Sequence, residues 1–118
     1  MKIGVYATLL QHMALDEMLD LVQSLGLESV ELSVGIYPKR RVVEPAEVLE
    51  SPARLQAVKD AFARRGLIVS AVSCHSNPLH PDPDIAGRSD LAYRNAVRLA
   101  AALGVGVVNC FSGCPAAG

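Results

Sequence analysis

One short unit recurs three times along the chain, and it limits the fold more than any other feature. Each copy is a stretch with apolar residues at helical spacing, then a glycine, then an apolar run. The glycines are Gly26, Gly66 and Gly104, which stand 40 and 38 residues apart. Glycine adopts the left-handed conformation that ends a helix without a steric penalty, and the apolar residue after it packs back on the last turn. The repeat therefore predicts helices that end at these glycines and lead directly into strands.

The segments between the glycines have the patterns that this interpretation requires. Apolar spacing predicts helices over 15–25, 52–65 and 89–103. Ser51 is suited to cap the second helix, and Pro52 suits its first position. In the third helix we expect four residues to face the core, Tyr93, Val97, Ala100 and Ala101. Runs rich in β-branched or small residues predict strands at about 2–8, 28–33, 67–74 and 105–111.

The resulting order is βαβαβαβ, which assigns the chain to the α/β class. Strands joined by helical crossovers are parallel, and we expect this sheet to be covered on both faces. Two architectures fit the order: a doubly wound open sheet, and the amino-terminal half of a (β/α)₈ barrel. The helix-to-strand connections are short, whereas 34–50 and 75–87 are long strand-to-helix loops. Because both architectures place their sites at the carboxyl ends of the strands, these loops predict the working face.

Composition excludes several classes of function. The chain has 118 residues, of which 51% are hydrophobic, so it can build a core and is not a disordered segment. Its net charge of −1 argues against a broad cationic surface for nucleic acid. No apolar run approaches the roughly 20 residues that cross a bilayer, and the apolar amino terminus lacks a signal-peptide cleavage site. We therefore expect a cytoplasmic protein without a membrane partner.

The third predicted strand leads into a loop with two histidines. His75 follows the strand directly, where an imidazole can orient a hydroxyl, move a proton or bind a metal. His80 lies in the same loop, whose three prolines restrict the backbone and so hold side chains at a lower entropic cost. The alternative for both is a structural histidine in a stiff turn. No second ligand stands at a recognisable metal-binding spacing, which makes His75 a weak metal candidate.

Glu31 and Asn109 are polar residues in or beside apolar strands. A carboxylate in a buried strand is costly unless it is paired or used, so Glu31 is either a pocket group or the partner of a cation such as Arg40 or Arg41. The basic run Lys39–Arg41 is a solvated loop or a clamp for a substrate phosphate. Asn109 ends the fourth strand, next to small residues that suit close approach of a ligand.

Three cysteines and the missing motifs narrow the chemistry further. The sequence has three cysteines, Cys74, Cys110 and Cys114, and an odd number argues against a set of disulfides. No two of them are separated by the two residues that are typical of zinc-binding or redox pairs, so we expect buried, unpaired thiols. No phosphate-binding Walker loop, dinucleotide fingerprint or His-Glu-x-x-His helix occurs in the sequence.

Four segments resemble the sugar phosphate isomerase/epimerase family of the xylose isomerase-like TIM-barrel superfamily: MKIGVYATLL at the start, LGLESVEL at 25–32, HSNPLHPD at 75–82 and VVNCFSGCP at 107–115. The resemblance covers the amino-terminal part of that barrel. It implies a small-molecule sugar substrate and a divalent metal (Mn, Co, Mg or Zn), whose ligands are expected on later strands. The substrate-facing residues that it implies are Tyr6, Glu31, His75, Asn77, His80 and Asn109.

We therefore interpret residues 1–118 as a single partial domain, the first three and a half β/α units of a barrel, from a metal-dependent sugar (phosphate) isomerase or epimerase. Without the later strands it is expected to be inactive. One alternative is a stand-alone α/β module that binds a ligand or forms homo-oligomers through its exposed sheet edges. Another is a zinc nuclease similar to the apurinic endonucleases, which the near-neutral charge disfavours.

Overall fold

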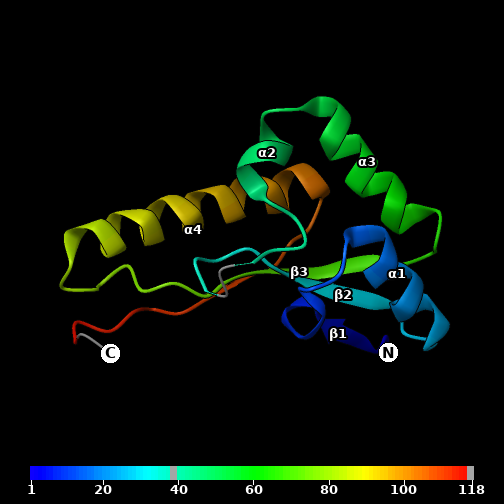
Figure 1. Ribbon diagram of the computed structural model, residues 1–118, viewed down its shortest axis with the longest axis horizontal. Helices are drawn as coiled ribbons and strands as arrows, with labels where there is room; N and C mark the ends of the chain where they lie inside the picture. The colour runs from blue at the N-terminus through cyan, green and yellow to red at the C-terminus, as the bar shows by residue number, and fades with distance from the viewer. Residues whose placement is uncertain (38–39, 117–118) are drawn as a thin grey trace.

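The computed structural model describes residues 1–37 and 40–116, and its centre is a parallel four-stranded sheet with the strand order β1-β2-β3-β4. Figure 1 shows the helices stacked on the sheet. Its outer strands are β1 and β4. The elements are β1 (Gly4–Tyr6), the 3₁₀ helix η1 (Ala7–Leu10), α1 (Leu15–Ser24), β2 (Ser29–Ser33), α2 (Pro45–Leu49), α3 (Pro52–Ala63), β3 (Ile68–Cys74), α4 (Pro83–Leu103) and β4 (Val108–Cys110).

The strand order decides between the two architectures. Each new strand is added on the same side of the one before it, so the direction of winding never reverses. Crossovers between parallel strands are right-handed, and crossovers in one direction therefore place their helices on one face. A doubly wound sheet reverses direction, whereas a (β/α)₈ barrel does not. The chain thus has the α/β arrangement of part of a barrel. The expectation that helices cover both faces of the sheet is wrong.

The three glycines end their helices as the repeat predicts. Gly26, Gly66 and Gly104 have φ values of +72°, +66° and +74°. The amide of the residue after each glycine donates to the carbonyl five positions back, and the glycine amide donates to the carbonyl three positions back. This pair of hydrogen bonds is the Schellman motif, which satisfies the last carbonyls of a helix. The same motif at all three sites turns each helix into the next strand.

The hydrophobic core lies between the sheet and these helices. Val30 and Leu32 of β2 and Val72 of β3 are at most 1% exposed. The helices contribute Met18, Leu19, Val22, Val58, Phe62, Ala96 and Leu99, all buried. Burying each large apolar side chain contributes about 1.5–3 kcal/mol. The sheet is consequently held rigidly from its helical side.

The third predicted helix differs from expectation in length and in orientation. It begins at Pro83, where the side chain of Asp82 accepts a hydrogen bond of 2.8 Å from the amide of Asp84. Tyr93 and Val97 are each 42% exposed, so the predicted inward face is wrong for both, and Ala101 is exposed as well. The buried stripe is instead Ser89, Ala96, Leu99 and Ala100. Small residues there let α4 approach β3 closely. The short helix α2 lies in a segment predicted to be a loop.

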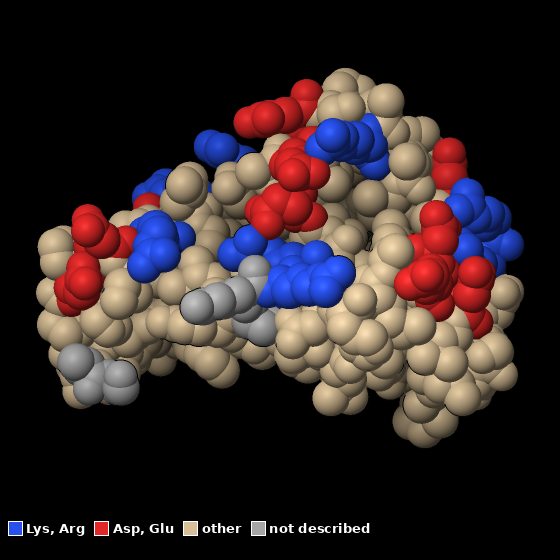
Figure 2. Space-filling view, viewed as in Figure 1, with Lys and Arg blue, Asp and Glu red and all other residues tan. Residues whose placement is uncertain are grey.

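In Figure 2, acidic and basic side chains are interspersed over the helices. The lower edge of the same view shows no charged side chains. In Figure 1 that edge holds η1 and the segment after β4. Within the described ranges, no helix is both long enough and apolar enough to span a membrane.

Candidate functional site

The face of the sheet away from the helices carries a row of polar side chains. Side chains alternate between the two faces of a strand, so the buried Val30 and Leu32 leave Glu31 and Ser33 on the other face. The parallel register continues this row across the neighbouring strands, because residues in register share a face. We call these residues the polar strip; they are Tyr6, Glu31, Ser33, Ser73, His75 and Asn109.

Tyr6 and His75 form the first contact of the polar strip. The Tyr6 hydroxyl donates to Oγ of Ser33 at 3.1 Å and lies 2.8 Å from Nδ1 of His75. A hydroxyl has a single proton, so with that proton on the Ser33 contact the ring must donate through Nδ1–H. The neutral imidazole then has its lone pair on Nε2. His75 is thereby set up to accept a proton or a hydrogen bond through Nε2.

The ring of His75 is also fixed by packing. Phe111 stacks on it with ring centroids 4.3 Å apart and an angle of 8° between the planes. Beneath it, Gly35 approaches the histidine backbone so closely that an added Cβ would lie 2.5 Å from both its N and its O atom. The amide of Tyr37 donates to the His75 carbonyl at 3.3 Å. These contacts hold the imidazole at the carboxyl edge of the sheet.

Glu31 receives two hydrogen bonds on one oxygen. Oγ of Ser73 donates to its Oε1, and Nδ2 of Asn109 donates to the same atom at 3.0 Å. Ser73 is fully buried, so its hydroxyl depends on this carboxylate for a partner. Three neighbouring strands thus meet at one acceptor, which ties the short outer strand β4 to the centre of the sheet.

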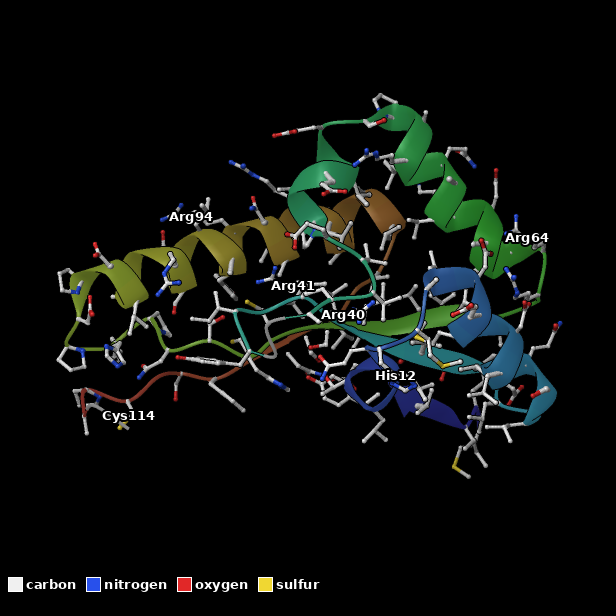
Figure 3. The ribbon with its side chains drawn as sticks, viewed as in Figure 1. His12, Arg40, Arg41, Arg64, Arg94 and Cys114 are labelled. Atoms are coloured by element: carbon white, nitrogen blue, oxygen red, sulfur yellow. The ribbon has the colours of Figure 1, made fainter. Side chains whose placement is uncertain are left out.

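The alternative for Glu31, an ion pair with Arg40 or Arg41, is not found among the described residues. Arg41 donates to Oε2 of Glu44 at 2.6 Å and to the carbonyl of Gly35 at 2.7 Å. No ion pair among the described residues includes Glu31. Figure 3 shows Arg40 and Arg41 on the segment between β2 and α2. Lys39 lies outside the described residues.

Asn77 and His80 make their contacts in the loops. The Asn77 side chain donates to the carbonyl of Cys114 at 2.9 Å and accepts from its amide at 2.8 Å. Nδ1 of His80 accepts from the amide of Asp82 at 3.0 Å, which places it at the start of α4. The structure therefore joins four of the six predicted residues in the polar strip. Asn77 instead joins the loop after β3 to the segment after β4, and His80 makes a local hydrogen bond at the start of α4, in the manner of its structural alternative.

Three residues of the site were not singled out from the sequence: Ser33, Ser73 and Phe111. The signal for the serines is alternation, since polar residues occupy every second position of Ser29–Ser33. That period predicts a strand with one polar face, whereas we expected both faces to be apolar. Nothing in the sequence pattern pairs Phe111 with His75.

The polar strip does not by itself supply a complete metal site. Within the described residues no group of three or more His, Cys, Asp and Glu side chains lies close enough to hold an ion. Glu31 and His75 are also engaged with Ser73, Asn109 and Tyr6. These residues alone therefore do not fit the divalent metal that the resemblance implies, and we assign no reaction step to such a metal.

Of the three thiols, Cys74 is buried, as expected, whereas Cys110 and Cys114 are exposed, which corrects the expectation for these two. Burial raises the pKa of the Cys74 thiol, since the thiolate is poorly solvated there. Cys114 lies in the segment after β4, far from α1 and α3 in Figure 3.

Comparisons with known proteins show the fold and a relative without an assigned activity. No family model matches the chain. A Bacillus subtilis (strain 168) protein named "Uncharacterized protein YfiH" is 30% identical over 120 residues, which cover all of this chain and 37% of that protein. A Rhodospirillum rubrum structure described as a "Putative Xylose isomerase" superimposes with a TM-score of 0.71 at 23% identity, over 96% of this chain and 40% of that one. The chain thus has the fold of part of a xylose isomerase-like barrel and spans well under half the length of either protein.

Proposed function

We propose that this chain forms the substrate-facing part of a sugar isomerase or epimerase, with the polar strip as its sugar-binding surface. The observation that carries the proposal is the contact between Tyr6 and His75 beside the Glu31–Asn109 contact, at the carboxyl edge of a singly wound sheet. This is the edge at which barrel enzymes hold their substrates.

The chemistry of the polar strip suits a polyhydroxylated ligand. Sugar hydroxyls both donate and accept, and the strip offers acceptors at Nε2 of His75 and on the carboxylate of Glu31. Asn109 is exposed and can both donate and accept. Phe111 is 59% exposed beside them and supplies an apolar surface. In this proposal His75 is the group that accepts or returns a proton, and Glu31 orients a hydroxyl.

The dependence on a divalent metal is a further part of the proposal and rests on the resemblance alone. Such a metal would polarise a carbonyl and a hydroxyl oxygen of the sugar. Its ligands would be groups other than the polar strip, because the described residues hold no cluster of three ligands.

Sugar binding is tested by nuclear magnetic resonance of the isotope-labelled chain, titrated with aldoses, ketoses and their phosphates. We expect saturable shifts at the amides of Tyr6, Glu31, His75 and Asn109. His75→Ala should abolish the shifts, and His12→Ala should keep them, since His12 is exposed on the turn after η1 and none of the hydrogen bonds of the polar strip includes it. Titrations in which no sugar shifts these amides would contradict the proposal.

Metal dependence is tested on the longest natural form of the protein that carries this sequence. Sugar interconversion is measured after chelation and after addition of Mn²⁺, Co²⁺, Mg²⁺ or Zn²⁺. We expect activity to return with one of the ions. Full activity in the chelated protein would contradict the metal requirement and leave the sugar-binding assignment standing.

A further inference from the structure

Two of the three cysteines, Cys74 of β3 and Cys110 of β4, are register partners on neighbouring parallel strands. Partners in register share a face, and neighbouring strands lie about 4.8 Å apart. A disulfide requires Cα atoms roughly 4.4–6.8 Å apart, so the backbone already satisfies its main condition.

Cys74 and Cys110 also line the same cavity. It has a volume of about 120 Å³ and lies between the sheet and the first turns of α4, where Pro78, Tyr93 and Phe111 line it. The space allows the side chains to rotate, which a close-packed core would prevent. Ser89 lines the cavity too, and its hydroxyl is fully buried without a hydrogen-bond partner among the described residues. Ser89 is thus an unused hydrogen-bond donor on the wall of the cavity that both cysteines line.

The two cysteines differ in access. Cys110 is exposed, whereas Cys74 is 1% exposed and lies 3.4 Å from Oγ of Ser76. An external oxidant can therefore reach Cys110 directly, and Cys74 is positioned to react with it from within. This division into an accessible and a resolving cysteine is the usual arrangement of a reversible dithiol.

We propose that Cys74 and Cys110 are a redox-active dithiol, which a low-molecular-weight disulfide converts into an intramolecular disulfide that locks β4 onto β3. The thiolate of Cys110 attacks the external disulfide, forms a mixed disulfide and releases one small thiol. The thiolate of Cys74 then attacks Sγ of Cys110 and releases the second small thiol. The protein loses two electrons and two protons, and the external disulfide gains them.

The position of Cys110 links this chemistry to the polar strip. It stands between Asn109, which donates to Glu31, and Phe111, which stacks on His75. The strand that carries them is only three residues long and forms the outer edge of the sheet. A covalent bond at Cys110 would restrict the motion of both neighbours. Oxidation should therefore preorganise the site, and this consequence rests on the proposed function whereas the disulfide itself does not.

The test treats the reduced chain with oxidised glutathione and identifies the products by mass spectrometry and peptide mapping. We expect a product two hydrogens lighter, with Cys74 linked to Cys110 and one thiol left to titrate after denaturation. Cys114→Ser should form the same link. Cys110→Ser should retain a free thiol at Cys74 and should form no intramolecular disulfide. A glutathione adduct that persists on Cys110, or a link from Cys110 to Cys114 or to a second chain, would overturn the proposal.

A second measurement reads the effect on the strand. Hydrogen exchange at residues 108–111 should slow about tenfold or more in the oxidised chain, because fraying of β4 is then opposed by the crosslink. The matched comparison is oxidised Cys110→Ser, in which the rates should not change. Sugar titration of both redox forms follows. A disulfide that slows exchange but leaves sugar affinity unchanged would refute the preorganisation step, and the absence of sugar binding in either form would count against the proposed function alone.

Discussion

The Tyr6 hydroxyl lies 2.8 Å from Nδ1 of His75, although the two residues are 69 positions apart in the chain. The contact crosses the middle of the sheet, since Tyr6 ends β1, His75 follows β3, and Ser33 of β2 accepts from the same hydroxyl. One phenol thus joins the carboxyl ends of three strands. It contacts Nδ1 of the histidine and so helps to fix the position of its ring.

Tyr6→Phe removes both hydrogen bonds and keeps the ring. Because the site is half-buried, we expect the free energy of unfolding to fall by about 1–1.5 kcal/mol. Urea denaturation measures the change. Tyr93→Phe is the matched control, since this tyrosine is 42% exposed on α4, and its effect should stay within about 0.5 kcal/mol. Equal effects of the two substitutions would show that the Tyr6 contact contributes nothing.

Glu31 is the acceptor for a hydroxyl that has no access to water. Glu31→Ala leaves the buried Ser73 hydroxyl unpartnered, so we expect a loss of about 1–3 kcal/mol in unfolding free energy. Glu31→Gln keeps an oxygen at the same position and should cost less than half of this. Its sugar affinity should nevertheless fall, because the charge is gone. Denaturation and titration of both variants separate the structural role from the binding role.

Gly35 and Gly87 make a matched pair for the close approach at His75. An added Cβ at Gly35 meets the histidine backbone at 2.5 Å, whereas one at Gly87 meets nothing within 4 Å. Gly35→Ala should therefore destabilise the chain and shift the resonances of His75. Gly87→Ala lies in α4 and should stabilise it by about 0.5–1 kcal/mol, the difference in helix propensity. A Gly35→Ala chain with wild-type stability and unshifted His75 resonances would contradict the close approach.

Asn77 holds the segment after β4 through both polar atoms of its amide. Asn77→Ala removes these hydrogen bonds, so the amide of Cys114 should exchange faster and the segment should be cleaved earlier by protease. Asn77→Asp keeps the acceptor but loses the donor, and an intermediate effect is expected. If neither variant changes exchange at Cys114, the segment is held by other contacts.

The elements that follow from local rules could be predicted from the sequence. Each glycine cap depends on residues within one helical turn, and the caps of all three helices occur where the repeat places them. The inward face of α4 could not be derived in this way. Tyr93 and Val97 suit a core by their apolar character, but close packing on β3 selects the smaller Ala96 and Ala100.

Only part of the candidate site could be predicted from the sequence, for a related reason. The carboxyl edge of the sheet could be inferred from loop lengths, and Tyr6, Glu31, His75 and Asn109 lie there. Their pairing depends on register across three strands, which no local pattern encodes. One example is the register shift between Val30 and Glu31 in the pairing of β2 with β3. This shift places Ser33 opposite Ser73. Counting from the start of the strands would misalign them.

The ion pairs between α1 and α3 depend on pH. Asp16 accepts from Nη2 of Arg64 at 2.5 Å and lies 3.0 Å from Nη1 of Arg65. Nε of Arg65 also donates to Asp20 at 2.6 Å. Figure 3 shows Arg64 at the end of α3, beside α1. The hydrogen bond from Arg64 lowers the pKa of Asp16 below its ordinary value of 3.8, with Arg65 adding to the effect. These contacts join the first repeated unit to the second.

The lowered pKa of Asp16 predicts a loss of stability in acid. In the unfolded chain the carboxyl takes up its proton at a higher pH than in the folded chain, so its contribution is fully present above about pH 4 and disappears as the pH falls through the folded pKa. Asp16→Asn should be less stable than the native chain at pH 6, and the difference should shrink as the pH falls below about 4. Asp60→Asn is the control, because Asp60 bonds the uncharged Gln56 on its own helix. Thermal denaturation at each pH measures both variants. A difference between Asp16→Asn and the native chain that stays constant from pH 6 to pH 2 would contradict the charged contact.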